Sequence, residues 1–151
     1  MSFLTSAKKV LDIEKEGLKS ISNHLGDSFD QAIEAILYSL NKNGKVVVVG
    51  IGKNWHISNK IVSTFNSTGT LAAVMHPIEA MHGDFGMLAK NDIIIAISYS
   101  GASDEMSALL PPIKRRGIPI IALTADKNSQ LAQYGDFIIN TSVPREACPF
   151  N

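Results

Sequence analysis

Short runs of consecutive apolar residues alternate along the chain with stretches in which apolar positions recur at helical spacing. Unbroken apolar runs of about five residues are typical of strands buried on both faces, as in a parallel sheet. Strands alternating with helices indicate the α/β class with a doubly wound sheet. The runs predict strands at 45–49, 71–75, 93–97, 118–123 and 137–139, and the patterns between them predict helices at about 6–25, 27–42, 57–65, 103–116 and 130–134.

Two of the predicted helices precede the first strand, and each has an apolar stripe. That stripe serves either packing within the fold or contact with a partner subunit. Asp27 and Ser28 are plausible N-caps of the second helix, and Asn43-Gly44 is a typical helix end. No repeat or linker-like stretch interrupts the chain, so we expect one domain over residues 1–151.

The strand at 93–97 is followed at once by small and hydroxyl-bearing residues, Ser98, Ser100, Gly101 and Ser103, and then by a helix. The N–H groups and positive dipole at a helix start favour an anion above the end of a parallel strand. Serine hydroxyls could complete a cradle around a phosphate. Alternatively, these serines only cap the next helix, and the pattern leaves both interpretations open.

A second strand, turn and helix begins at 45–49 and continues through Gly50-Ile51-Gly52-Lys53. The two glycines permit close approach of a ligand, and Lys53 either reaches an anion or is simply solvated. A dinucleotide site is disfavoured because the third glycine of its fingerprint is missing. In parallel sheets, ligands gather beyond the carboxyl ends of the strands. We therefore expect residues 50–53, 76–82 and 98–103 to lie together beyond the carboxyl ends of the strands, here called the rim of the sheet.

His76, Glu79, His82 and Asp84 lie within nine residues. Such a group suits a metal ion or proton transfer. The simpler interpretation is a capped short helix followed by a turn, and taken alone the residues favour it.

The chain has 151 residues with 14 basic and 14 acidic side chains, so its formal net charge is zero. This balance argues against nucleic acid or a membrane surface as the main partner. The single cysteine, Cys148, excludes an internal disulfide and favours the cytoplasm. The N-terminus lacks the features of a secretory signal, and no apolar run approaches the roughly 20 residues that span a bilayer.

Several short blocks, in this order, resemble the SIS (sugar isomerase) domain and within it the arabinose 5-phosphate isomerase branch. The resemblance covers about residues 44–150, and its motifs are specific as a set. They are Gly50-Ile51-Gly52-Lys53, His56-Ile57, Thr64-Phe65, Ser67-Thr68-Gly69-Thr70, His76-Pro77, Glu79-Ala80, His82-Gly83-Asp84, Gly86-Met87, Ser98 with Ser100-Gly101, and Glu146-Ala147-Cys148-Pro149.

The resemblance implies a three-layer αβα sandwich with a mainly parallel sheet, assembled as a homotetramer. It implies interconversion of arabinose 5-phosphate and ribulose 5-phosphate, which supplies the sugar acid of lipopolysaccharide, with no required cofactor. By matching position, it implies catalytic roles for Lys53, Glu105 and Glu146. It implies sugar-phosphate contacts for Gly69, Thr70, His82, Ser98, Ser100, Gly101 and Ser103, and an incidental or inhibitory zinc ion at His76.

The chemistry fits these residue types. An aldose–ketose isomerase needs a base for a carbon-bound proton and positive charge near the enediolate oxygens. Either Glu105 or Glu146 is the expected base, and Lys53 would steady the oxyanion or the phosphate.

The chain departs from the family pattern at four places. Asn54-Trp55 replaces Ser-Gly, Ile78 replaces glycine, and Ala102 replaces glutamate. The family also continues with a further helix and a catalytic histidine, and longer members carry CBS modules, so the chain looks like a fragment that lacks both. An alternative function is a non-catalytic SIS module that binds a sugar phosphate as a sensor or regulator; a nucleotide-binding Rossmann domain is the weakest hypothesis.

Overall fold

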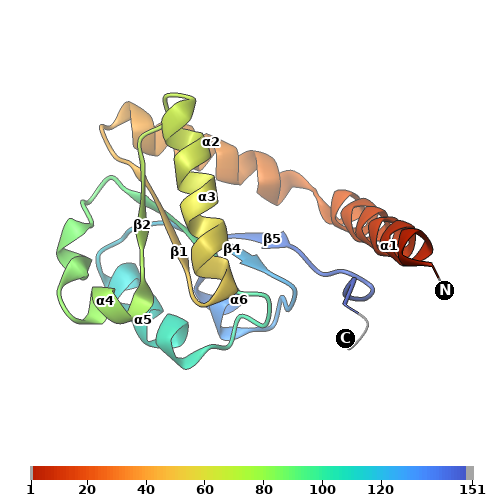
Figure 1. Cartoon of the computed structure of the whole chain (residues 1–151). Coiled ribbons are helices and arrows are strands. Elements are labelled where there is room, and N and C mark those ends of the chain that lie inside the picture. Colours follow the sequence, from red (N-terminus) through yellow and green to blue (C-terminus); the bar gives the residue numbers. More distant parts are fainter. Residues whose placement is uncertain (1, 149–151) are drawn as a thin grey trace.

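A five-stranded, all-parallel sheet forms the centre of the computed structural model, which describes residues 2–148. The strands lie in the order β2-β1-β3-β4-β5 (Figure 1). Each starts and ends within about two residues of its predicted position, so the predicted α/β class with a parallel sheet is confirmed. The strands are β1 (Val46–Gly50), β2 (Ala72–Met75), β3 (Ile93–Ile97), β4 (Ile120–Thr124) and β5 (Phe137–Asn140).

Helices cover both faces of the sheet and make three layers. One face packs against α2 (Asp27–Asn41) and α3 (Lys53–Ser67). The other packs against α4 (Pro77–Met81), the short 3-10 helix η1 (Asp84–Met87), α5 (Asp104–Arg115) and α6 (Gln130–Tyr134). The predicted αβα sandwich is therefore confirmed.

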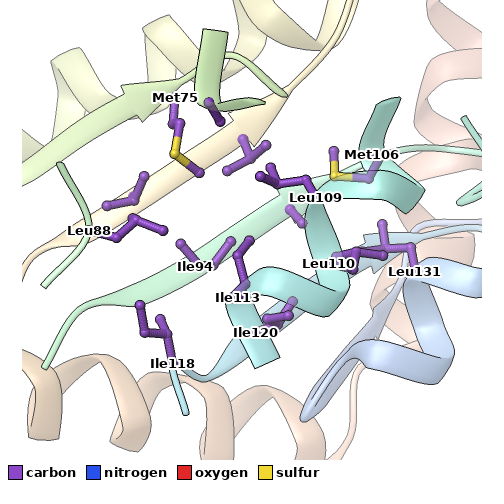
Figure 2. Packing of buried hydrophobic residues seen from close by; sticks show 14 of the residues in the cluster. Met75, Leu88, Ile94, Met106, Leu109, Leu110, Ile113, Ile118, Ile120 and Leu131 are labelled. Atoms are coloured by element: carbon purple, nitrogen blue, oxygen red, sulfur yellow. The ribbon is translucent and has the colours of Figure 1, made fainter. Parts of the chain in front are cut away.

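Successive residues of the central strands point into opposite layers, as the two-residue period of a strand requires. Val47 and Ile94 lie in the layer under α5, whereas Val46 and Ile93 lie in the layer under α2 and α3. Figure 2 shows the first layer, in which Leu109, Leu110 and Ile113 of α5 pack onto Ile94 and Ile120 of the sheet. This double burial is why the strands read as unbroken apolar runs.

The first helix, α1 (Phe3–His24), projects from the sandwich as an arm beyond β5 (Figure 1). Only Ile13 and Gly17 are buried in it. Gly17 permits a close approach, because a Cβ there would lie 3.2 Å from Cγ1 of Val143. The arm thus contacts the segment that follows β5, and most of its surface faces solvent.

The predicted N-caps of the second helix are wrong. Gly26 occupies the cap position of α2 and offers no side chain. The Ser28 hydroxyl instead donates to the carbonyl of Ile138 at 2.9 Å and accepts its N–H at 3.1 Å. Because β5 is an edge strand, Ile138 has backbone groups without a strand partner on that side. Ser28 therefore forms hydrogen bonds with the edge strand β5 instead of capping α2.

The predicted end of α2 is confirmed. Asn43 adopts a left-handed conformation (φ 59°), and the N–H of Gly44 bonds to the carbonyl of Ser39 at 2.9 Å. Just beyond, the buried Asp92 receives the Lys45 N–H at 3.0 Å and the Lys45 Nζ at 2.6 Å. The ion pair between Lys45 and Asp92 thus joins the amino ends of β1 and β3, opposite the expected rim.

Candidate functional site

The chain leaves the adjacent strands β1 and β3 toward opposite faces of the sheet, and the switch point between their carboxyl ends is here called the crevice. From β1 the chain enters α3 on one face, and from β3 it enters α5 on the other. In open α/β sheets this switch point, outside the carboxyl ends of the strands, is where ligands bind. The structure therefore places Lys53 and the 98–103 turn on the two sides of one crevice, as the sequence predicted.

The glycine turn holds the start of α3 close to the end of β1. Gly52 is the N-cap of α3 with a φ of 57°, a conformation that favours glycine. A Cβ on Gly50 would lie 2.7 Å from both the carbonyl oxygen of Asn54 and Oγ of Ser58. Only glycine permits this helix-on-strand contact. It places Lys53, whose side chain is exposed, in the first turn of α3 beside the crevice.

The turn after β3, residues 98–103 and here called the serine turn, is held in shape by hydrogen bonds within it and by a contact with α6. The Oγ of buried Ser98 accepts the N–H of Gly101 at 3.1 Å, and the Oγ of Ser100 accepts the N–H of Ala102 at 3.4 Å. Gly101 has a φ of 63° and is buried, and a Cβ there would collide with Ser129. Its carbonyl accepts the N–H of Leu131 at 3.0 Å, which ties the turn to α6.

Two residues that sequence reasoning missed support this turn from the neighbouring β4 and α6. The Thr124 hydroxyl donates to the carbonyl of Tyr99 at 3.1 Å, and Ser129 packs under Gly101 while capping α6 through the N–H of Ala132. Both are buried. Their signals were present in the sequence, since Thr124 ends an apolar run and Ser129 precedes a helical one.

The start of α5 has no side-chain cap. Ser103 is at the N-cap position, but its side chain makes no capping hydrogen bond. The alternative in which the serines merely cap the helix is therefore wrong for Ser103, while Ser98 and Ser100 brace the turn. A helix start with a free hydroxyl and backbone N–H groups suits an anion. Glu105 is exposed in the same first turn and is the candidate base at this rim.

The histidine and carboxylate group at 76–84 forms a capped short helix and a turn. Nδ1 of His76 accepts the N–H of Ile78 at 3.3 Å and so caps α4. The Trp55 ring meets the His76 ring edge-on at 5.1 Å between centroids, which joins the loops after β1 and β2. His82 is exposed at the C-cap of α4.

The zinc ion that the resemblance implied at His76 stays a prediction. Within residues 2–148, no group of three His, Cys, Asp or Glu side chains is placed to hold a metal ion. Zinc on Nδ1 of His76 would displace the Ile78 N–H that this nitrogen accepts.

Three of the residues matched by resemblance lie away from the crevice in this chain. Gly69 and Thr70 precede β2, so they lie near the amino ends of the strands, whereas Lys53 follows the carboxyl end of β1. Glu146 lines a hollow of about 510 Å³ together with residues of α1, beyond β5. Because β3 and β4 separate β5 from β1, the ends of those strands are about 14 Å apart. Of the two candidate bases, only Glu105 is at the rim.

Another hollow, of about 580 Å³, lies beneath α2 at the amino ends of the strands, next to Tyr38, Asp92 and Pro119. Its buried carboxylate is already neutralised by Lys45. It therefore offers little for an anion, and the crevice between β1 and β3 remains the better candidate.

A family model described as the SIS domain matches residues 39–150. The chain belongs to the SIS domain family. Among curated relatives, the SIS chain is 45% identical over 150 residues to arabinose 5-phosphate isomerase KdsD of Francisella tularensis, covering 99% of this chain and 46% of that protein. It is 42% identical over 151 residues to the KdsD of Pseudomonas aeruginosa, covering 100% of this chain and 45% of that one. It thus spans less than half the length of these relatives.

Solved structures agree with the fold. The protein c3406 of E. coli CFT073, solved in complex with arabinose 5-phosphate, is 33% identical with a TM-score of 0.79, and the match covers 99% of this chain and 80% of that one. A structure from Bacteroides fragilis described as a phosphosugar isomerase candidate is 32% identical with a TM-score of 0.86, covering 95% and 77% of the two chains. Among residues 2–148, no helix is both long and apolar enough to cross a membrane.

Proposed function

We propose that this SIS domain binds arabinose 5-phosphate in the crevice between β1 and β3 and takes part in its isomerisation to ribulose 5-phosphate. The observation that carries the proposal is the uncapped start of α5, with the braced serine turn on one side and Lys53 on the other. The relatives named arabinose 5-phosphate isomerase, and the neighbour solved with that sugar phosphate, support the choice of sugar.

In this proposal the phosphate lies at the start of α5, held by the Ser103 hydroxyl and backbone N–H groups. Ser98, Ser100 and Gly101 keep the turn in shape, and His82 contacts the sugar. The base removes the proton from C2 and returns it to C1, while a proton passes from the oxygen on C2 to the oxygen on C1. Glu105 is the base in this account, and the Lys53 ammonium stabilises the enediolate oxygens.

The proposal extends to the setting of the enzyme. In the reverse direction the reaction supplies arabinose 5-phosphate, a precursor of the sugar acid of lipopolysaccharide, in the cytoplasm. The protein works as a homo-oligomer, a tetramer by family resemblance. Gly69, Thr70 and Glu146 reach a sugar in this scheme only from another subunit or after rearrangement.

The test is proton exchange in heavy water. The 151-residue protein is incubated with arabinose 5-phosphate in D₂O, and the sugar is followed by proton NMR. We expect ribulose 5-phosphate carrying deuterium at C1. Lys53→Met should lower the rate about 100-fold or more, as loss of an oxyanion stabiliser does. Lys60→Met, on the exposed side of the same helix, is the matched control and should exchange normally.

A second function, a non-catalytic module that senses a sugar phosphate, is favoured by the separation of Glu146 from Lys53. It predicts that arabinose 5-phosphate binds without any deuterium entering the sugar. Binding with exchange would exclude the sensor, and absence of both would contradict both functions.

A further inference from the structure

The rim of the sheet carries an aromatic contact that the proposed chemistry does not use. Trp55, the single tryptophan of the chain, lies in the first turn of α3, just beyond the carboxyl end of β1. Its ring meets the ring of His76, which follows β2, with 5.1 Å between the centroids and 77° between the planes. Both residues are half-buried, so part of each is open to solvent at the rim.

The backbones that carry these two rings are fixed by hydrogen bonds. In α3, the Trp55 N–H donates to the carbonyl of Gly52 at 3.1 Å, and the Trp55 carbonyl accepts Nδ2 of Asn59 at 2.7 Å. At the start of α4, Nδ1 of His76 accepts the N–H of Ile78 at 3.3 Å, which also sets the orientation of the imidazole ring. The rings of Trp55 and His76 therefore form a fixed surface, here called the aromatic wall.

The aromatic wall lies on the β2 side of β1, whereas the serine turn follows β3 on the other side. The three strand ends are level, because Val49 of β1 pairs with Met75 of β2 and with Ala96 of β3. Two strand spacings, or about 10 Å, therefore separate the end of β2 from the end of β3. Lys53 lies between them, because it follows β1, the middle strand of the three.

The length of a five-carbon sugar phosphate in its open form matches this span. Seven bonds join the phosphorus to the oxygen on C1, and at about 1.5 Å per bond in a zigzag chain they extend about 9 Å. A sugar with its phosphate at the start of α5 thus brings C1 and C2 past Lys53 to the aromatic wall. One more carbon lengthens the chain by about 1.3 Å, which a fixed turn and a fixed wall do not accommodate.

We propose that Trp55 is a specificity-determining residue, whose ring, held by His76, limits the site to five carbons and so selects pentose phosphates over longer sugar phosphates. The inference rests on the proposed function and adds to it the chain length of the sugar and the residue that sets it. An indole suits this role because it is large and has only two rotatable bonds. A hydroxyl pressed against its apolar face also loses hydrogen bonds to water.

The first test uses Trp55 itself as the probe. Because the chain has one tryptophan, tryptophan fluorescence reports on this ring alone. The 151-residue protein is titrated with arabinose 5-phosphate, and binding is followed by calorimetry and by fluorescence. We expect both signals to give the same dissociation constant. Calorimetric binding without a change in fluorescence would overturn the role of Trp55 and leave the proposed function standing.

Selectivity is then measured by calorimetry with D-altrose 6-phosphate, which has one more carbon than arabinose 5-phosphate and the same configuration at C2 to C4. The wild-type protein should bind this longer sugar about 10-fold or more weakly, a usual effect of one extra carbon in a fitted site. Trp55→Ala should bring the two dissociation constants to within about threefold of each other, because the space beyond C1 is then open. Trp55→Phe keeps a ring against His76 and should retain the preference.

Ile57→Ala is the matched control. Ile57 is 51% exposed and lies two residues after Trp55, on the opposite side of α3, so this variant should keep the wild-type preference. Far-UV circular dichroism of each variant verifies that the helices form.

The outcomes separate this inference from the function. A preference that survives in Trp55→Ala, even at lower affinity for both sugars, overturns the inference, because the ring then serves the fold alone. Equal binding of both sugars by the wild-type protein overturns it as well, and leaves the proposed function standing. A wild-type protein that binds neither sugar contradicts the proposed function and the inference with it.

Discussion

Replacing Gly101 by alanine tests the serine turn that forms one side of the proposed site. The new Cβ would collide with the Oγ of Ser129 and lie 2.5 Å from its Cβ and 2.8 Å from Oγ1 of Thr124. Rotating Ser129 away would not remove the contact with its Cβ and would break its cap on Ala132. The residue must also hold a φ of 63°, where an L-residue is strained.

The magnitude follows from these two effects. The left-handed backbone costs about 1 kcal/mol for alanine, and an overpacked contact costs about 1–3 kcal/mol. We expect Gly101→Ala to lower the free energy of unfolding by about 2–4 kcal/mol. Gly117 is the matched control: its φ is 68°, and nothing lies within 4 Å of a Cβ there, so Gly117→Ala should cost only about 1 kcal/mol.

Urea unfolding of the three proteins measures the difference, and calorimetric titration with arabinose 5-phosphate measures the site. Gly101→Ala should also lose most of its affinity, because the turn moves away from the start of α5. Equal unfolding free energies for the two variants, with unchanged affinity, would refute the packing argument and the assignment of the turn.

Two further predictions concern a buried ion pair and a hydroxyl. Asp92 is 2% exposed and forms an ion pair with Lys45, so Asp92→Ala should lower the free energy of unfolding by about 3 kcal/mol. Asp12 forms an exposed ion pair with Lys15, so Asp12→Ala is the control and should change this free energy by less than about 0.5 kcal/mol. Urea unfolding measures both. Ser103→Ala should leave stability unchanged and weaken the binding of arabinose 5-phosphate about tenfold by calorimetry, whereas Ser98→Ala should destabilise by about 1–2 kcal/mol; the reverse pattern would contradict the proposed roles.

The sheet and most helix positions could be predicted because the strands are buried on both faces. The run at 93–97 is β3 as predicted, and the helix at 130–134 has the predicted ends. The rim at Lys53 and Ser103 followed from one rule, that residues after a parallel strand share an edge. The same rule already separates Gly69 and Thr70 from that rim, since they precede a strand.

Other features depend on contacts between segments far apart in the chain. Ser28 resembles an N-cap locally, but its hydroxyl satisfies the backbone of Ile138, 110 residues away. The place of Glu146 depends on the path after β5 and on the direction in which α1 projects, and the sequence pattern predicts neither of them. The contacts of Thr124 and Ser129 with the serine turn form only when β4 and α6 pack beside it, so the local sequence does not reveal them.

The most direct test of the proposed site is a titration of the ¹⁵N-labelled protein with arabinose 5-phosphate, followed by amide chemical shifts. The account predicts the largest shifts at the amides of 52–55 and 100–105, on both sides of the crevice between β1 and β3. Largest shifts in the hollow beneath α2, around Tyr38 and Pro119, or in the hollow between α1 and Glu146, would contradict it.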